Sequence, residues 1–182
     1  MARDDPLSRL LEARARGDTG YLIESLRLYP EHAGLTAGWL AGDAVGDAIP
    51  ALAWLLSAAN PHARVAAIKA LERLGLPLDL KPRLVEIAKT DLDDGVRSWA
   101  TSAIGSYGDR ELTPLLISLL ADPSWRVSAA AVLALGKQGD PSALQPLRLA
   151  PRSLRRSPLR FYVYRRLYGE AIRTLSSEAK DP

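Results

Sequence analysis

The sequence lacks cysteine entirely and contains only two histidines. The protein therefore has no disulfide, no thiolate metal site and no cysteine nucleophile, and two histidines alone do not make a transition-metal cluster. Long hydrophobic runs are also missing. The longest, residues 48–59, contains Pro50 and Ser57 and falls short of the roughly 20 residues that cross a membrane. The N-terminal residues have no hydrophobic signal core, so we expect a cytoplasmic protein.

Residues that favour strands are scarce. Valine and isoleucine contribute 7 residues each, whereas leucine contributes 32 and alanine 28. Because leucine and alanine are strong helix formers, this composition predicts an all-α fold. The length of 182 residues suits one domain or one continuous repeat array.

A repeat of about 31 residues runs through most of the chain. Val65, Val96 and Val127 are 31 residues apart, and each stands beside an arginine. Other series keep nearly the same spacing: Asn60, Asp91 and Asp122; Gly108 and Gly139; and Pro50, Pro82, Pro114 and Pro146. Such a period, combined with apolar residues at helical spacing, is typical of stacked helix pairs.

Residues 122–146 show how one helix pair is expected to form. Asp122 and Pro123 open the first helix, because a carboxylate accepts orphan backbone N–H groups and proline fits the first turn. Gly136 and Gly139 are interpreted as turn glycines that end this helix, and Asp140 begins the next. The same template predicts five units at about 5–29, 31–58, 61–90, 92–121 and 123–150, which form a repeat array over residues 1–150. A basic, aromatic helical cap and tail follows at residues 151–182.

These residues carry a resemblance to a known family. Residues 122–146 resemble the short HEAT-like repeats of the phycobilisome-lyase type, and residues 92–122 resemble them clearly. The likeness is weaker in residues 31–91, where Leu76-Pro77-Leu78-Asp79 replaces a Gly-x-x-Gly-Asp turn. The resemblance implies an α-solenoid, a HEAT-like superhelix of about five stacked antiparallel helix pairs. It also implies a concave surface, lined by the second helices, that binds a partner.

The sequence contains no recognisable catalytic constellation. A P-loop, a dinucleotide-binding glycine fingerprint and a nucleophile elbow are all missing. His32 and His62 take equivalent positions near helix starts. Helix capping explains the recurrent carboxylates Asp47, Asp109 and Asp140. We therefore expect a protein that is not an enzyme and binds no metal and no other cofactor.

Recurrent arginines are predicted to have a structural role. Arg64, Arg97 and Arg126 recur with the repeat, and we expect them to bridge neighbouring turns through the series Asn60, Asp91 and Asp122. A different pair, Trp39 and Asp43, shares one helical face. A tryptophan beside a carboxylate is similar to the arrangement in HEAT-like alkylpurine DNA glycosylases, with simple packing as the alternative.

Trp54 is the first candidate for partner binding. It takes a second-helix position that is polar or small in the other units. Its counterparts there are Glu86, Ser118 and Ala150. An exposed tryptophan is a natural anchor at a protein interface; the alternative is that the N-terminal helix pair covers it. Lys81, Arg83 and Glu86 are the further contacts expected on the second helices.

Positive charge is concentrated at the C-terminal end. Residues 1–147 hold 15 basic and 18 acidic side chains, whereas residues 148–182 hold 9 and 3. The candidate contact residues of this segment are Arg155, Arg156, Arg160, Tyr162, Arg165 and Arg166. Arginine interleaved with aromatic residues suits an acidic protein surface, nucleic acid or anionic lipid. The alternative is a solvated cap whose aromatic residues pack on the last repeat.

The leading hypothesis is a non-catalytic scaffold or adaptor that binds a protein partner, preferably an acidic one, through its second helices and its basic C-terminal segment. The second hypothesis is a nucleic-acid-binding HEAT-like protein, similar to the DNA glycosylases. The third, which rests on the family resemblance alone, is a lyase-type or chaperone-type subunit for cofactor attachment.

Overall fold

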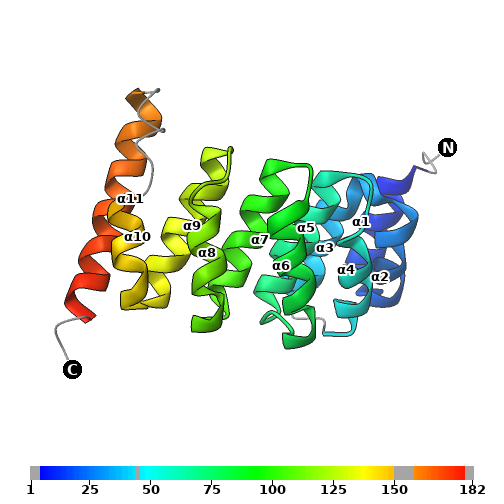
Figure 1. The fold of residues 1–182 in the computed structure, drawn as a ribbon. Helices are drawn as coiled ribbons and strands as arrows, with labels where there is room; N and C mark the ends of the chain where they lie inside the picture. The colour runs from blue at the N-terminus through cyan, green and yellow to red at the C-terminus, as the bar shows by residue number, and fades with distance from the viewer. Residues whose placement is uncertain (1–4, 44–45, 150–157, 179–182) are drawn as a thin grey trace. The chain divides into compact units, whose positions relative to one another are not determined.

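The protein is described by a computed structural model that places residues 5–43, 46–149 and 158–178 (Figure 1). These residues form helices and turns and contain no strand, which confirms the predicted all-α fold. The α-helices are α1 (Pro6–Arg16), α2 (Thr19–Leu28), α3 (Ala33–Gly42), α4 (Ile49–Leu55), α5 (Pro61–Arg73), α6 (Lys81–Thr90), α7 (Asp94–Ser106), α8 (Thr113–Leu119), α9 (Trp125–Gln138), α10 (Leu144–Leu149) and α11 (Pro158–Glu178).

Short 3-10 helices connect many of these elements. They are η1 (Pro30–His32), η2 (Gly46–Ala48), η3 (Leu78–Leu80), η4 (Arg110–Leu112) and η5 (Pro141–Ala143). From η2 onward, each lies directly before a second helix, where the sequence predicted one continuous helix from the turn onward. The second helices are consequently shorter than expected, and their tight 3-10 entries keep each hairpin compact.

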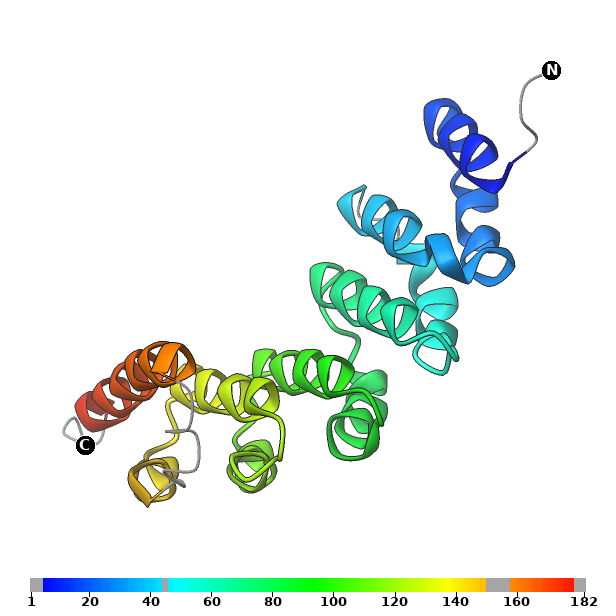
Figure 2. The ribbon, with the colours of Figure 1, turned by 90° about the horizontal axis from the view of Figure 1, so that it is seen from above.

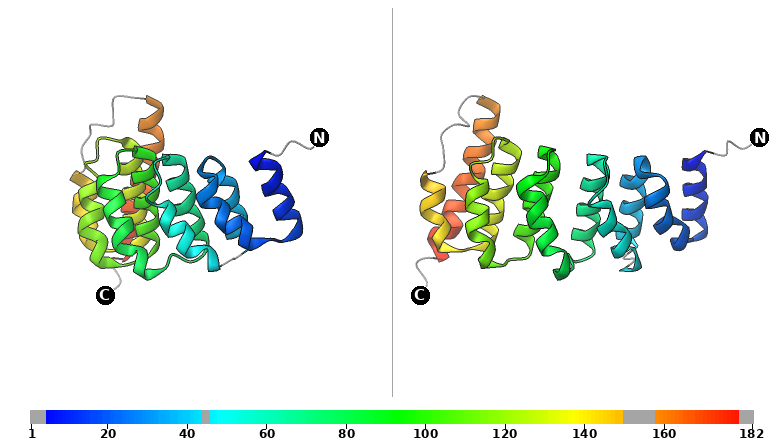
Figure 3. Two further views of the ribbon diagram at one scale, coloured as in Figure 1. Left: turned by 90° about the vertical axis from the view of Figure 1, so that its right-hand side faces the viewer. Right: turned by 45° about the vertical axis from the view of Figure 1, so that its right-hand side comes forward.

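The chain divides into two compact units, residues 1–81 and residues 82–182. In the first unit, α3 packs against α5 and α2 packs against α4. In the second unit, α9 packs between α7 and α11, with α8 and α10 on the other side of this layer (Figure 2). Within each unit the first helices thus form one layer and the second helices another, as expected for an α-solenoid. Figure 3 shows α7, α9 and α11 running in the same direction.

The caps of the first helices correct the predicted register. Asn60 caps α5 and Asp93 caps α7, each accepting a backbone N–H at 2.9 Å, while Ser124 caps α9. The cap of α9 is therefore not Asp122, which accepts the N–H of Ser124 at 2.7 Å in the preceding turn. Successive caps lie 33 and then 31 residues apart, so the regular 31-residue grid is wrong between α5 and α7.

The corrected register explains the core. The third residue after each cap is Ala63, Val96 or Val127, and each of the three is buried. Val65, which the regular grid equated with Val96 and Val127, is only half-buried on α5. Ala63 of α5, and not Val65, is therefore the equivalent of Val96 and Val127. The sequence pattern did not reveal this because α5 has alanine where α7 and α9 have valine.

Two glycines allow close packing rather than chain reversal. Gly105 lies inside α7, and a Cβ atom there would collide with Ala134 of α9. Gly136 lies inside α9, and its Cβ would come within 2.9 Å of the Cβ of Ala171 on α11. The predicted turn role of Gly136 is therefore wrong. Gly139, with φ of 70°, ends α9 in the left-handed conformation as expected.

The contact between Gly136 and Ala171 shows how the C-terminal segment packs on the last repeat. α11 is one helix and occupies the position of a further first helix beside α9. Ala171 and Leu175 are its buried residues among those whose side chains are described. The alternative in which the aromatic residues of this segment pack on the last repeat concerns Phe161, Tyr164 and Tyr168; the first two side chains lie outside the described part, and Tyr168 is half-buried.

Arginine side chains connect successive helix pairs, as predicted. Arg97 donates two hydrogen bonds of 3.0 Å to the carboxylate of Asp122 and another of 2.9 Å to the carbonyl oxygen of Asp91. The side chains of this ion pair are only 13% and 9% exposed. Hydrogen bonding to Asp122 raises the pKa of Arg97 further above its usual value. Arg64 makes the corresponding backbone contacts, donating to the carbonyl oxygens of residues 58 and 59 at 2.8 and 3.1 Å.

Arg126 differs from its two predicted counterparts. Its guanidinium lies 3.6 Å from Asp94 of the preceding first helix, and both side chains are well exposed. Arg126 follows the cap of α9 by two residues, whereas Arg97 follows the cap of α7 by four. A valine stands next to an arginine in both α7 and α9, but Arg126 lies two residues nearer to its helix cap than Arg97 does.

Candidate protein-binding surfaces

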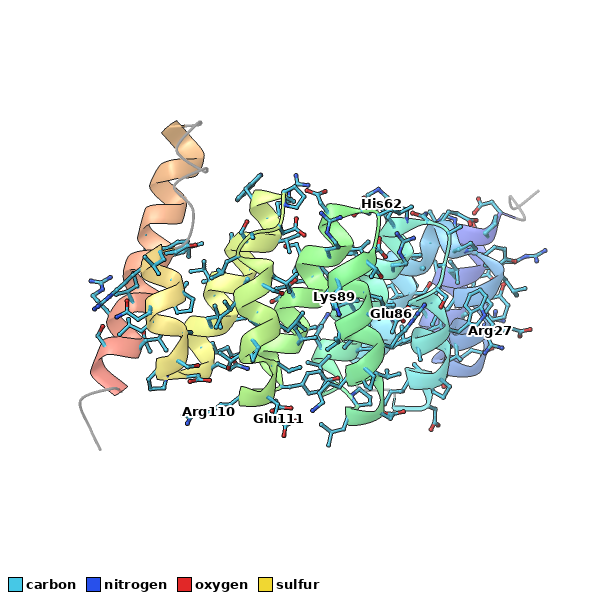
Figure 4. All side chains as sticks on the ribbon, viewed as in Figure 1. Arg27, His62, Glu86, Lys89, Arg110 and Glu111 are labelled. Atoms are coloured by element: carbon cyan, nitrogen blue, oxygen red, sulfur yellow. The ribbon has the colours of Figure 1, made fainter. Side chains whose placement is uncertain are left out.

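Trp54 is exposed on the second-helix side of the first unit. It lies on α4 and is 48% exposed, so the N-terminal helix pair does not cover it. The guanidinium of Arg27, on α2, lies 5.7 Å from the centre of the indole ring (Figure 4). A cation over the face of a tryptophan is attractive and limits the orientations of both side chains. The first unit therefore presents a large, oriented aromatic group.

The predicted equivalence of Trp54 with positions in later units agrees with their exposure. Glu86 on α6 and Ser118 on α8 are both exposed. The third equivalent, Ala150, lies outside the described residues. The second helices therefore point this position toward solvent, and α4 alone of the described helices fills it with an aromatic side chain.

The other predicted contacts on the second helices divide between the two units. Lys81 closes the first unit, whereas Arg83 and Glu86 belong to the second. The structure brings Arg83 and Glu86 together, with 2.6 Å between Nη1 and Oε2, and both side chains are well exposed. An exposed pair of this kind adds little stability, so both charges are accessible to a partner at small cost.

Only part of the basic C-terminal segment is described. Arg155 and Arg156 lie outside the described residues. Arg160, Tyr162 and Arg165 lie on α11, whose first turns are described for the backbone alone. Arg166 is exposed and pairs with Glu170 one turn later, at 3.0 Å.

Trp39 and Asp43 are held by a third residue that sequence reasoning missed. Arg14 of α1 forms an ion pair with Asp43, and its guanidinium lies 6.0 Å from the Trp39 ring. This cluster joins the first helix pair to the second. The carboxylate that suggested a DNA glycosylase is thus engaged by an arginine of the same unit.

A further surface was not predicted at all. Trp99 and Leu133 are 37% and 51% exposed, and both line a groove of about 270 Å³ between α7 and α9. The residues lining it are Ser98, Trp99, Ser102, Trp125, Arg126, Ala129, Ala130 and Leu133. Trp99 and Trp125 stand out when α5, α7 and α9 are aligned by their helix caps. The other two helices have no tryptophan at either position.

The described part of the chain contains neither a cluster of metal-binding side chains nor a helix that could span a membrane. No three of its acidic or histidine side chains lie close enough together to hold a metal ion. His62 lies at the start of α5 and is exposed to solvent (Figure 4). Among the same residues, no helix is both long and apolar enough to span a membrane.

Comparison with known proteins defines the class. The family model of HEAT repeats matches residues 22–105 and 81–157, which together cover most of the chain. The chain therefore belongs to the HEAT-repeat family, in agreement with the resemblance seen in its sequence. It is also similar to a phycobilisome maturation protein of Synechococcus elongatus, with 36% identity over 94 residues. This match covers 50% of the chain and 42% of the relative, so the chain spans less than half of that protein.

Proposed function

We propose that this HEAT-repeat protein is a non-catalytic scaffold that binds a protein partner through the second-helix surface around Trp54. The observation that carries the proposal is the exposed indole of Trp54, oriented by Arg27 at a position that is polar or small in the other helix pairs. About half of the Trp54 side chain stays exposed to solvent in the folded protein. Tryptophan and arginine are the residue types most enriched at the energetic centres of protein interfaces.

The size of the effect is sufficient for an anchor. Covering the exposed half of a tryptophan removes roughly 100 Å² from water, which is worth about 2–3 kcal/mol. The Arg27 contact lowers the conformational entropy that Trp54 loses on binding, because the ring is already oriented. Trp54 can therefore contribute a substantial part of the affinity of a modest interface.

The basic C-terminal segment supports an acidic partner. Residues 148–182 carry 9 basic side chains and only 3 acidic ones. Clustered positive charge accelerates association with a negatively charged surface and favours it over basic competitors. In this proposal Trp54 supplies the anchor, and Arg155, Arg156, Arg160, Arg165 and Arg166 supply the complementary charge.

Quantitative affinity capture tests the proposal. The wild-type protein, Trp54→Ala and Leu92→Ala are used as baits in extracts of the native cell, and bound proteins are compared by mass spectrometry. Leu92 is 98% exposed and provides a control truncation of an exposed apolar residue. We expect a partner retained by the wild type and Leu92→Ala and lost from Trp54→Ala. Equal recovery by all three baits contradicts the role of Trp54.

A second candidate function follows from the relative that is a phycobilisome maturation protein. In this alternative the chain is a lyase-type or chaperone-type subunit, and its partner is a protein of the phycobilisome. The shared sequence over 94 residues supports it. Size-exclusion chromatography with purified phycobilisome proteins checks it: co-elution with one of them supports the assignment, and separate elution from every one rejects it.

A further inference from the structure

The two helices that carry Arg27 and Trp54 contain only two charged side chains. α2 contains Glu24 and Arg27, whereas residues 48–60, which include α4, contain no charged residue. α2 and α4 pack against each other, and the side chains of Glu24 and Arg27 are both exposed. These two residues therefore determine the charge pattern of the second-helix surface around Trp54.

Glu24 and Arg27 do not form the ion pair that their spacing favours. Side chains three residues apart on a helix are neighbours, and the acid here precedes the base, which is the favourable order. Exposed charges at the same spacing do pair on α6, where Nη1 of Arg83 lies 2.6 Å from Oε2 of Glu86. The guanidinium of Arg27 lies instead 5.7 Å from the centre of the Trp54 ring.

Arg27 can therefore still bind an anion. Within the described part of the chain, its guanidinium contacts the Trp54 ring and makes no hydrogen bond or ion pair. A guanidinium has five N–H donors in a planar fork that matches the two oxygens of a carboxylate. The attraction to an aromatic ring requires the positive charge and none of these donors. The surface thus combines an exposed indole with a carboxylate-binding group beside it.

The charge balance of the first unit distinguishes between kinds of anion. Residues 1–81 hold 9 basic and 10 acidic side chains. Nucleic acid and anionic lipid are bound by several positive charges acting together. Here Glu24 stands one turn before Arg27, which is the only cation on α2 and α4. A carboxylate side chain, in contrast, needs only one guanidinium. The first unit therefore favours an acidic residue of a protein over a polyanion.

We propose that the protein partner places an acidic side chain on Arg27 and a neighbouring apolar side chain on Trp54, an inference that rests on the proposed function of this surface. The carboxylate accepts hydrogen bonds from the guanidinium, and the apolar side chain covers the indole. Glu24 repels a second acidic residue one turn away, so the surface selects a single acidic residue beside an apolar one.

Selection from a phage-displayed library of random peptides tests this proposal. Peptides that bind the full-length protein and lose affinity for Trp54→Ala identify the site. We expect these peptides to carry aspartate or glutamate close to an apolar residue, and replacement of that acid by its amide to weaken binding at least tenfold. Trp54-dependent peptides that lack an acid, or that bind equally well as amides, overturn the inference and leave the proposed function intact. A library without any Trp54-dependent peptide counts against both.

A double-mutant cycle assigns the carboxylate to Arg27. Arg27→Gln should weaken the acidic peptide at least tenfold but its amide form less than about threefold, because the amide has no charge to lose. Arg16→Gln is the matched control and retains full affinity, since Arg16 is an exposed arginine of the same unit that pairs with Glu12 at 3.5 Å. Far-UV circular dichroism confirms that each variant is folded. Equal weakening of both peptides by Arg27→Gln would show that Arg27 only orients Trp54, and would refute the assignment.

Discussion

Arg97 joins two successive helix pairs of the second unit through contacts that are almost closed to solvent. Its guanidinium binds the Asp122 carboxylate with two hydrogen bonds and also reaches a carbonyl oxygen at the start of its own unit. A buried charge is stabilised only while its partner is present. Removal of the Asp122 carboxylate is therefore expected to lower the stability of the fold by more than the intact ion pair adds to it.

Removal of the Asp122 carboxylate is expected to destabilise the protein strongly. Asp122→Ala leaves the Arg97 charge buried without its counter-ion and should lower the free energy of unfolding by about 3 kcal/mol. Glu170→Ala, which breaks the exposed pair with Arg166, is the control and should change stability by less than about 0.5 kcal/mol. Urea denaturation measures both. Similar losses in the two variants would show that the Arg97 pair has no special role.

Asp94 is expected to contribute to the pH dependence of stability. The hydrogen bond from the Ser124 hydroxyl and the positive charges of Arg126 and Arg97 lower its pKa in the folded protein, although burial opposes them. Its contribution is therefore present above the ordinary carboxyl pKa of about 3.9 and is lost as the pH falls through that value toward the lower folded one. When the pH is lowered from about 6 to about 3, the free energy of unfolding should fall less in the Asp94→Asn variant than in the wild type. Equal losses in urea denaturation at the two pH values would contradict this assignment.

At the scale of helices, glycines inside α7 and α9 determine how closely the next first helix approaches. Ala134 packs on Gly105, and Ala171 packs on Gly136. A side chain at either glycine forces its neighbour outward, because close-packed interiors accommodate added atoms poorly. These two contacts place α9 and α11 in the same layer as α7.

Gly136→Val is expected to loosen α11. The new side chain meets Ala171 and should cost about 2 kcal/mol, and the backbone amides of α11 should exchange hydrogen faster than in the wild type. The control is Gly38→Ala in α3, where an added Cβ meets nothing within 4 Å and stability should rise by up to about 1 kcal/mol. Hydrogen exchange read by mass spectrometry tests this. Unchanged protection of α11 in Gly136→Val would show that the contact is not needed for its packing.

The helix pairs were predictable from the sequence, whereas the exact register was not. Proline, turn glycines and apolar spacing are local signals, and they located the hairpins correctly. The two-residue shift between α5 and α7 was missed because Ala63 replaces the valine that marks the other units. Gly136 was misassigned because a packing glycine and a turn glycine look alike in one sequence. The partner of Asp43 was missed because Arg14 lies on a different helix pair.

The candidate sites differ in how far the sequence revealed them. Trp54 was found because it breaks the pattern of a repeat position, and the structure shows it exposed. Trp99 and Trp125 break the pattern in the same way, but only alignment by the true caps, Asp93 and Ser124, makes this visible. Their grouping across α7 and α9 is a tertiary property, which periodicity along one helix does not contain.

At the scale of the whole molecule, the dependence of binding on salt distinguishes the two leading kinds of partner. The basic C-terminal segment suits an acidic protein in the proposed function and nucleic acid in the alternative. Nucleic acid binding would release counter-ions, weaken steeply with salt and persist on unrelated sequences. We expect no binding of nonspecific DNA at about 50 mM salt, measured by fluorescence anisotropy. Binding that disappears when Arg155, Arg156, Arg165 and Arg166 are replaced by alanine would favour the nucleic-acid alternative instead.

The central claim is that this HEAT-repeat protein holds a protein partner through Trp54. The most direct measurement is the dissociation constant of the captured partner for the wild type, Trp54→Ala and Leu92→Ala, obtained by isothermal titration calorimetry. Loss of about 2–3 kcal/mol of apolar burial predicts that Trp54→Ala binds roughly 30- to 150-fold more weakly, while Leu92→Ala binds as the wild type does. A dissociation constant unchanged by Trp54→Ala would contradict the claim.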